Sequence, residues 1–111
     1  RMDAITAVSG SGPAYVFYFI EAMQQAAREL GFSAEEARRL SIETFAGAAK
    51  LAAGSAEDAA TLRARVTSKG GTTERALQTM EAAEVKREIV RGVLAAAERS
   101  RELGEELGKQ G

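Results

Sequence analysis

Apolar residues recur along most of the chain at the three- and four-residue spacing that places side chains on one face of an α-helix. The first repeat follows Pro13, a residue that suits a first helical turn, and stops at Gly31, a residue type that commonly ends helices. The pattern therefore predicts a first helix between these two residues. Its apolar members are Tyr15, Val16, Phe19, Ile20, Met23, Ala26, Ala27 and Leu30.

A second helix is predicted between Ser33 and Gly54. Ser33 and Glu36 have the spacing of a capping box, in which each side chain accepts a hydrogen bond from the other residue's backbone N–H. Ser55 then has the residue type of a cap for a shorter third helix. The apolar faces are Ala37, Leu40, Ile42, Phe45, Ala48, Ala49 and Ala52 in the second helix, and Ala59, Leu62 and Val66 in the third.

Two further helices are predicted, one near residues 73–82 and a longer one from Val85 to Leu107. In the last helix, Arg101 and Glu105 stand one turn apart, which is typical of a solvated face. Strand patterns are few, and the 111 residues have the usual length of one domain. The chain is therefore predicted to be an all-α bundle of about five helices.

Alanine dominates the apolar positions. The sequence contains 23 alanines against 27 residues of Val, Ile, Leu, Met, Phe and Tyr together. Small side chains let helices approach closely, which favours pairing between chains. Moreover, Tyr15, Phe17, Tyr18 and Phe19 are too close in sequence to share one face of a helix. We therefore expect one apolar face of the first helix in the core and another against a partner chain or a missing domain.

The charge and the missing residue types exclude several functions. The formal net charge is −1, without the strong positive field of a nucleic-acid-binding protein. Neither cysteine nor histidine occurs, which excludes disulfides, thiolate metal sites and histidine-dependent catalytic triads. No apolar run approaches the ~18 to 20 residues of a membrane span. We expect no metal, nucleic acid or membrane as a partner, and a cytoplasmic location.

The segment from Thr67 to Thr73 has the composition of an anion-binding turn. Gly70 and Gly71 lack the Cβ atoms that would keep a ligand from the main chain, and both tolerate positive φ angles. The helix predicted next would direct unpaired N–H groups and a partial positive charge at a carboxylate or phosphate. The alternative is a plain turn followed by a threonine N-cap. Further donors are the hydroxyls of Ser68, Thr72 and Thr73.

Three blocks of the sequence resemble the pyrroline-5-carboxylate reductase family. Residues 66–81 read Val-Thr-Ser-Lys-Gly-Gly-Thr-Thr-Glu-Arg-Ala-Leu-Gln-Thr-Met-Glu, which is similar to the family's signature segment. Residues 4–16 contain Ser9-Gly10-Ser11-Gly12-Pro13 and are similar to the entry into its C-terminal helical domain, and residues 47–50 match a third stretch. Order and separations fit over essentially the whole chain. Lys69 is a departure, because many members have proline there.

The resemblance implies a fold and a reaction. Residues 1–111 would be the C-terminal dimerisation and substrate-binding domain, similar to that of 6-phosphogluconate dehydrogenase and interlaced with its twin in a homodimer or a higher oligomer. The N-terminal Rossmann domain, which binds most of the NADPH or NADH, is missing from this chain, so the chain alone is expected to be inactive. The family reduces 1-pyrroline-5-carboxylate to L-proline.

The resemblance also implies roles for particular residues. The carboxylate of the small-molecule substrate would lie against the glycine segment, and the Thr73 hydroxyl would help to deliver a proton to the ring nitrogen. The turn of Ser9, Gly10 and Ser11 would lie close to the nicotinamide. The residues implied for substrate binding are Ser68, Gly70, Gly71, Thr72 and Thr73.

Two other functions compete with this interpretation. One is a non-catalytic helical oligomerisation module whose glycine segment is only a turn. The other is the substrate domain of a related NAD(P)-dependent dehydrogenase, although those would be expected to carry a lysine-centred catalytic helix, which has no obvious equivalent in this sequence.

Overall fold

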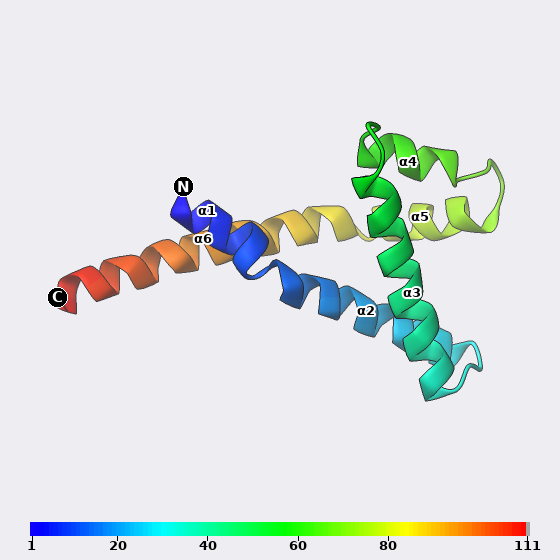
Figure 1. Cartoon of the computed structure of the whole chain (residues 1–111), viewed down its shortest axis with the longest axis horizontal. Helices are drawn as coiled ribbons and strands as arrows, with labels where there is room; N and C mark the ends of the chain where they lie inside the picture. Colours follow the sequence, from blue (N-terminus) through cyan, green and yellow to red (C-terminus); the bar gives the residue numbers. More distant parts are fainter. Residues whose placement is uncertain (111) are drawn as a thin grey trace. The chain divides into compact units, whose positions relative to one another are not determined.

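The computed structural model describes the backbone of residues 1–110 and the side chains of residues 1–108, and this part of the chain is helical without a β-strand (Figure 1). The all-α prediction is confirmed. The elements are α1 (Met2–Ile5), the π-helix η1 (Thr6–Gly10), α2 (Gly12–Glu29), α3 (Ala34–Ala53), α4 (Ala59–Arg65), α5 (Thr72–Ala82) and α6 (Val85–Gln110). None of these helices is long and apolar enough to cross a membrane.

The chain divides into two compact units. One contains residues 1–15 together with the residues from 76 onwards, and the other contains residues 16–75. In the first unit, α1 and η1 pack against α6 (Figure 1). The Ser100 hydroxyl of α6 donates a hydrogen bond to Asp3 Oδ1 over 2.8 Å, and Ala7 of η1 is buried to 1% exposure.

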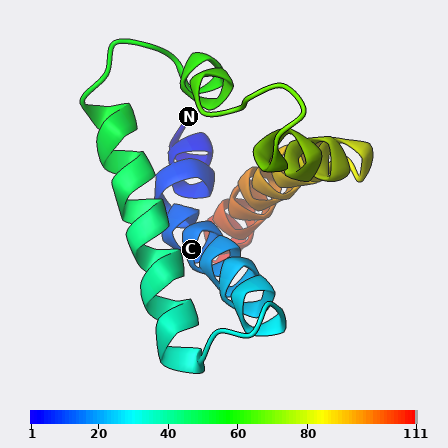
Figure 2. The same cartoon turned by 90° about the vertical axis from the view of Figure 1, so that its right-hand side faces the viewer.

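In the second unit, α2 and α3 are joined by a tight turn, which Figure 2 shows in cyan. Gly31 has a φ of +103°, and its N–H donates to the Arg28 carbonyl over 3.0 Å. The N–H of Phe32 donates to the Ala27 carbonyl over 3.1 Å, which completes a Schellman motif. The predicted helix end at Gly31 is therefore confirmed.

The start of α3 is also confirmed. The Ser33 N–H donates to Glu36 Oε1 over 2.9 Å, and the Glu36 N–H donates to Ser33 Oγ over 3.1 Å, so both bonds of the capping box form. The Phe19 ring of α2 meets the Phe45 ring of α3 edge to face, with centroids 5.6 Å apart. Gly54 ends α3 as predicted.

Two local predictions were wrong. The cap of α4 is Asp58, whose Oδ1 accepts from the Thr61 N–H over 2.9 Å, while Ser55 only closes a turn by accepting from the Glu57 N–H. An aspartate directly before the first helical residue outcompetes a serine three positions earlier. The turn expected at Ser9, Gly10 and Ser11 is instead the end of a helical segment that runs from Met2 to Gly10.

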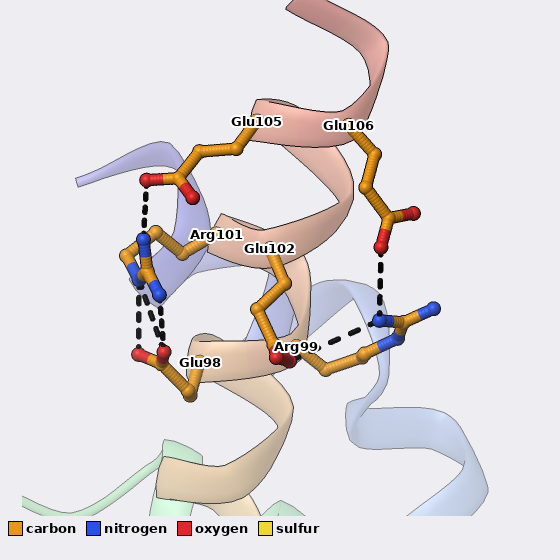
Figure 3. Close-up of polar contacts among 6 residues, drawn as sticks. All are labelled: Glu98, Arg99, Arg101, Glu102, Glu105 and Glu106. Carbon is orange, nitrogen blue, oxygen red and sulfur yellow. Dashed lines mark hydrogen bonds and ion pairs between the residues drawn. The ribbon is translucent and has the colours of Figure 1, made fainter. Parts of the chain in front are cut away.

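Residues 98–106 of the last helix form a set of exposed ion pairs between arginine and glutamate side chains (Figure 3). Arg101 contacts Glu98 and Glu105, and its hydrogen bond lowers the pKa of Glu98 while raising its own pKa. The predicted pair of Arg101 and Glu105 is confirmed. Such exposed pairs contribute little to stability individually.

Large apolar side chains remain uncovered on several helices. Among the described residues, only small side chains are buried, namely Ala7, Ala37 and Ser41. By contrast, Phe17 is 64% exposed and Tyr18 is 77% exposed, although both belong to α2. Other large apolar residues that are mostly exposed are Ile5, Val8, Leu30, Leu51, Val66, Ile89, Leu94 and Leu107. Several helices thus carry large apolar side chains that no other part of the chain covers.

The two capping carboxylates predict how stability depends on pH. Hydrogen bonding from the Ser33 N–H lowers the pKa of Glu36 from 4.5, and hydrogen bonding from the Thr61 N–H lowers the pKa of Asp58 from 3.8. Because the folded-state values are the lower ones, the stabilisation is complete above the ordinary pKa values and is lost as pH falls through the folded ones. We expect the unfolding free energy to decrease between about pH 6 and about pH 3.

Urea unfolding at fixed protein concentration measures this dependence. Asp58→Asn keeps a good N-cap that does not titrate, so its unfolding free energy should change less over the same pH interval. An identical pH dependence in the parent chain and in Asp58→Asn would contradict the assignment of Asp58 as a titrating cap.

Candidate functional site

The glycine loop, residues 66–71, joins α4 to α5 and is anchored at its start by backbone bonds. The N–H groups of Val66 and Thr67 donate to the carbonyls of Arg63 and Ala64 over 3.2 and 3.1 Å. The Thr67 hydroxyl also donates to the Arg63 carbonyl, over 2.6 Å. These bonds continue the last turn of α4 and place Ser68 as the first residue of the tight turn.

The two glycines occupy positions that disfavour other residues, each for a different reason. Gly70 has a φ of +75°, in the left-handed region that favours glycine. A Cβ on Gly71 would lie 2.7 Å from Ser68 Oγ and 3.2 Å from the Ser68 carbonyl oxygen. The second distance involves backbone, so a side chain at Gly71 would displace the turn as well as approach any ligand.

The loop already uses two of its backbone donors internally. The Gly70 N–H donates to Glu74 Oε1 over 2.9 Å, and the Gly71 N–H donates to the Ser68 carbonyl over 3.1 Å. The first helical bond, from the Arg75 N–H to the Gly71 carbonyl over 3.2 Å, makes Gly71 the N-cap of α5. Thr72 is therefore the first helical residue, one position before the expected start, and the N-cap is a glycine and not a threonine.

The donors directed out of the helix start are those of the first turn of α5. In any α-helix the first N–H groups have no acceptor one turn earlier within the helix, and they carry the positive end of the dipole. In this chain they belong to Thr72, Thr73 and Glu74, because the first helical bond is donated by the Arg75 N–H. Thr73 is half-buried, whereas Ser68, Gly70 and Thr72 are exposed. The arrangement can hold a carboxylate through backbone N–H groups with hydroxyls beside them.

Sequence reasoning missed Glu74. Its carboxylate reaches back to the Gly70 N–H, in the manner of the glutamate of a capping box but one residue further upstream. The signal was present in the sequence, since Gly71 and Glu74 have the N-cap to N3 spacing. Glu74 fixes the turn in its left-handed conformation, which positions the first N–H groups of α5.

The other candidate residues, Ser9, Gly10 and Ser11, lie in the first unit, whereas the glycine loop lies in the second. Ser9 and Gly10 are the last residues of η1, and Ser11 follows it. The Ser9 hydroxyl donates to the Ile5 carbonyl over 3.0 Å, and the Ser11 N–H donates to the Thr6 carbonyl over 2.8 Å. The expected turn is thus the end of the π-helix, with Ser9 in its last turn and Ser11 directly after it.

Metal chemistry finds no support in these residues. Within the described part of the chain, no three carboxylates, or other typical ligands, come together in a group that could hold a metal ion. The candidate groups are backbone N–H groups and hydroxyls, which suit an anion.

The helical fold and the uncovered apolar faces define a class, that of all-helical domains whose apolar faces are not covered within the chain. The chain belongs to the pyrroline-5-carboxylate reductase family, since residues 1–103 match the family model described as pyrroline-5-carboxylate reductase dimerisation. This match agrees with the resemblance carried by the glycine segment.

Individual relatives bear this out. The pyrroline-5-carboxylate reductase of Pseudomonas aeruginosa is 47% identical over 109 residues, which are 98% of this chain and 40% of the relative. That of Methanosarcina acetivorans is 41% identical over 103 residues, 93% of this chain and 38% of the relative. This chain therefore spans about 40% of the length of the relatives it matches.

Two solved structures have the same fold. The pyrroline carboxylate reductase of Plasmodium falciparum, solved with NADP bound, has a TM-score of 0.90 at 35% identity, covering 93% of this chain and 42% of that one. The pyrroline-5-carboxylate reductase of Coxiella burnetii has a TM-score of 0.89 at 41% identity, covering 93% of this chain and 38% of that one.

The left-handed turn predicts that Gly70 is needed for stability. In Gly70→Ala the positive φ of +75° is strained for a residue with a side chain, and the unfolding free energy should fall by about 1 to 2 kcal/mol. Gly104→Ala is the matched control, because a Cβ would meet nothing within 4 Å at either glycine, but Gly104 lies within α6 and has no positive φ. This control should raise the unfolding free energy by up to about 1 kcal/mol. Urea unfolding compares the two, and equal effects would contradict the role of the turn.

Proposed function

We propose that the full-length protein is a pyrroline-5-carboxylate reductase, which reduces 1-pyrroline-5-carboxylate to L-proline in the last step of proline biosynthesis. The observation that carries this proposal is the family match over residues 1–103. It is supported by a glycine loop that leads into the N-terminus of α5, where backbone N–H groups can bind an anion. Residues 1–111 are the C-terminal dimerisation and substrate-binding domain, and an N-terminal Rossmann domain completes the enzyme. The protein acts in the cytoplasm.

The substrate carboxylate lies at the start of α5. The N–H groups of Thr72 and Thr73 bind it, and the Ser68 hydroxyl lies at the edge of this site. Gly70 and Gly71 leave room for the carboxylate beside the backbone and hold the turn that directs these donors. Backbone donors suit this task because they need no rearrangement when the anion arrives.

The Thr73 hydroxyl contacts the ring nitrogen of the substrate. A hydroxyl is a weak acid in water, so Thr73 orients the imine and relays a proton from solvent. NADPH or NADH, held mainly by the Rossmann domain, supplies the hydride. The structure solved with NADP bound supports the use of a pyridine nucleotide in the family. Ser9, Gly10 and Ser11 lie close to the nicotinamide.

The protein works as a homodimer in which the helical domains are interlaced, and dimers can build a higher oligomer. The aromatic side chains of α2 support this arrangement, because Phe17 and Tyr18 form an exposed apolar surface that the chain itself does not cover. The family model is itself described as a dimerisation domain.

Assembly predicts a first result. This chain should sediment as a dimer at micromolar concentration. Phe17→Glu replaces a phenyl side chain that is 64% exposed in the single chain with a charged one, and it should shift the equilibrium to monomer. Gln78→Glu, an exposed position of α5, adds the same charge and should leave the dimer intact. Sedimentation of the parent chain as monomer alone would contradict the interlaced arrangement.

Catalysis predicts a second result. Thr73→Val in the full-length enzyme keeps the side-chain volume but removes the hydroxyl, so kcat should fall about 10- to 100-fold, which is about 1.4 to 2.7 kcal/mol of transition-state stabilisation. Thr44→Val is the control, because the Thr44 hydroxyl donates only within α3, to the Leu40 carbonyl over 2.7 Å. Parent-like turnover by Thr73→Val would contradict the proposed role of this hydroxyl in orienting the imine and relaying a proton.

A further inference from the structure

The π-helix η1 changes which carbonyls accept hydrogen bonds. In an α-helix the Ser11 N–H would donate to the Ala7 carbonyl, four residues earlier. Here it donates to the Thr6 carbonyl, five residues earlier, over 2.8 Å. The Ala7 carbonyl is bonded instead by the Tyr15 hydroxyl, over 2.7 Å.

This bond stabilises the wide turn where it is most needed. Ala7 is 1% exposed, and a buried carbonyl without a donor costs stability. Tyr15 is half-buried in the first turn of α2, eight residues further along the chain. Its hydroxyl therefore compensates for the bond that the five-residue spacing removes, and it ties the end of η1 to the start of α2.

The wide turn determines how the next residues are presented. One extra residue in a helical turn rotates every later side chain by about 100° about the helix axis relative to an uninterrupted helix. Single-turn π-helices are frequent at functional sites. Ser9, Gly10 and Ser11 are the residues at this turn, so their orientation depends on whether the five-residue spacing persists.

We propose that Tyr15 is a positioning residue for the cofactor side of the site. This inference rests on the proposed function, in which Ser9, Gly10 and Ser11 lie close to the nicotinamide. Tyr15 does not touch the cofactor in this role. Its hydroxyl holds the Ala7 carbonyl, and through it the wide turn that orients the two serines.

The test is Tyr15→Phe in the full-length enzyme, which removes one hydroxyl and keeps the ring. The kcat/KM for NAD(P)H should fall about 2- to 12-fold, the range that the net contribution of one hydrogen bond implies. The KM for pyrroline-5-carboxylate, measured at saturating cofactor, should stay within about 2-fold of the parent value. Thr44→Val is the control: it also removes one hydroxyl, which donates only within α3 to the Leu40 carbonyl, and it should change neither parameter.

Amide hydrogen exchange supplies a readout that does not depend on activity. The amides of residues 7–12 should exchange faster in Tyr15→Phe than in the parent, and at the parent rate in Thr44→Val. A folded Tyr15→Phe enzyme with parent-like kcat/KM for NAD(P)H would overturn the proposal. An equal loss in the parameters of cofactor and substrate would also overturn it, since that pattern indicates general destabilisation.

The two hypotheses fail in different ways. If the parent enzyme does not oxidise NAD(P)H with pyrroline-5-carboxylate, the proposed function fails, and the exchange rates still decide whether Tyr15 holds the turn. If the parent is active and Tyr15→Phe matches it in both kinetics and exchange, only the role of Tyr15 fails.

Discussion

The structure depends on one constraint: the apolar faces of its helices are larger than the chain can cover. Within the described residues the fully buried side chains are small, while aromatic and branched side chains stand exposed on α2, α3 and α6. Alanine explains part of this, because 23 alanines bury little area each but let helices approach closely. A compact domain covers such faces in its own core, whereas covering them here would require a further chain or domain, in line with the proposed dimer.

Much of the helical architecture could be predicted from the sequence because its signals are local. The capping box of Ser33 and Glu36 and the left-handed Gly31 depend on residues within one or two turns, and both form as predicted. The same locality made the prediction at Ser55 wrong, since two good capping residues lie close together and only Asp58, the neighbour of the first helical residue, caps the helix. Residue type identifies candidate caps, but register decides between them.

The helix before Pro13 could not be predicted, and the reason is physical. A five-residue turn interrupts the apolar period that identifies a helix, so the segment from Met2 to Gly10 lacks a clean pattern. Its partners are distant in sequence: Asp3 bonds to Ser100, and the Ala7 carbonyl bonds to Tyr15. Of the candidate site, the glycines and hydroxyl residues could be predicted from the sequence. The role of Glu74 could not, because it depends on the Gly70 N–H, from which its carboxylate accepts a hydrogen bond.

These internal bonds explain how a short glycine loop can serve as a binding element. A glycine-rich turn is flexible in isolation, and ordering it on binding would cost conformational entropy. Here the Gly70 N–H is held by Glu74 and the Gly71 N–H by the Ser68 carbonyl, so the turn is ordered by its own chain. The N–H groups that form these bonds belong to the two residues before Thr72, the first helical residue of α5. The loop thus uses its glycine amides to fix its shape, which leaves the first amides of α5 as the donors best placed for an anion.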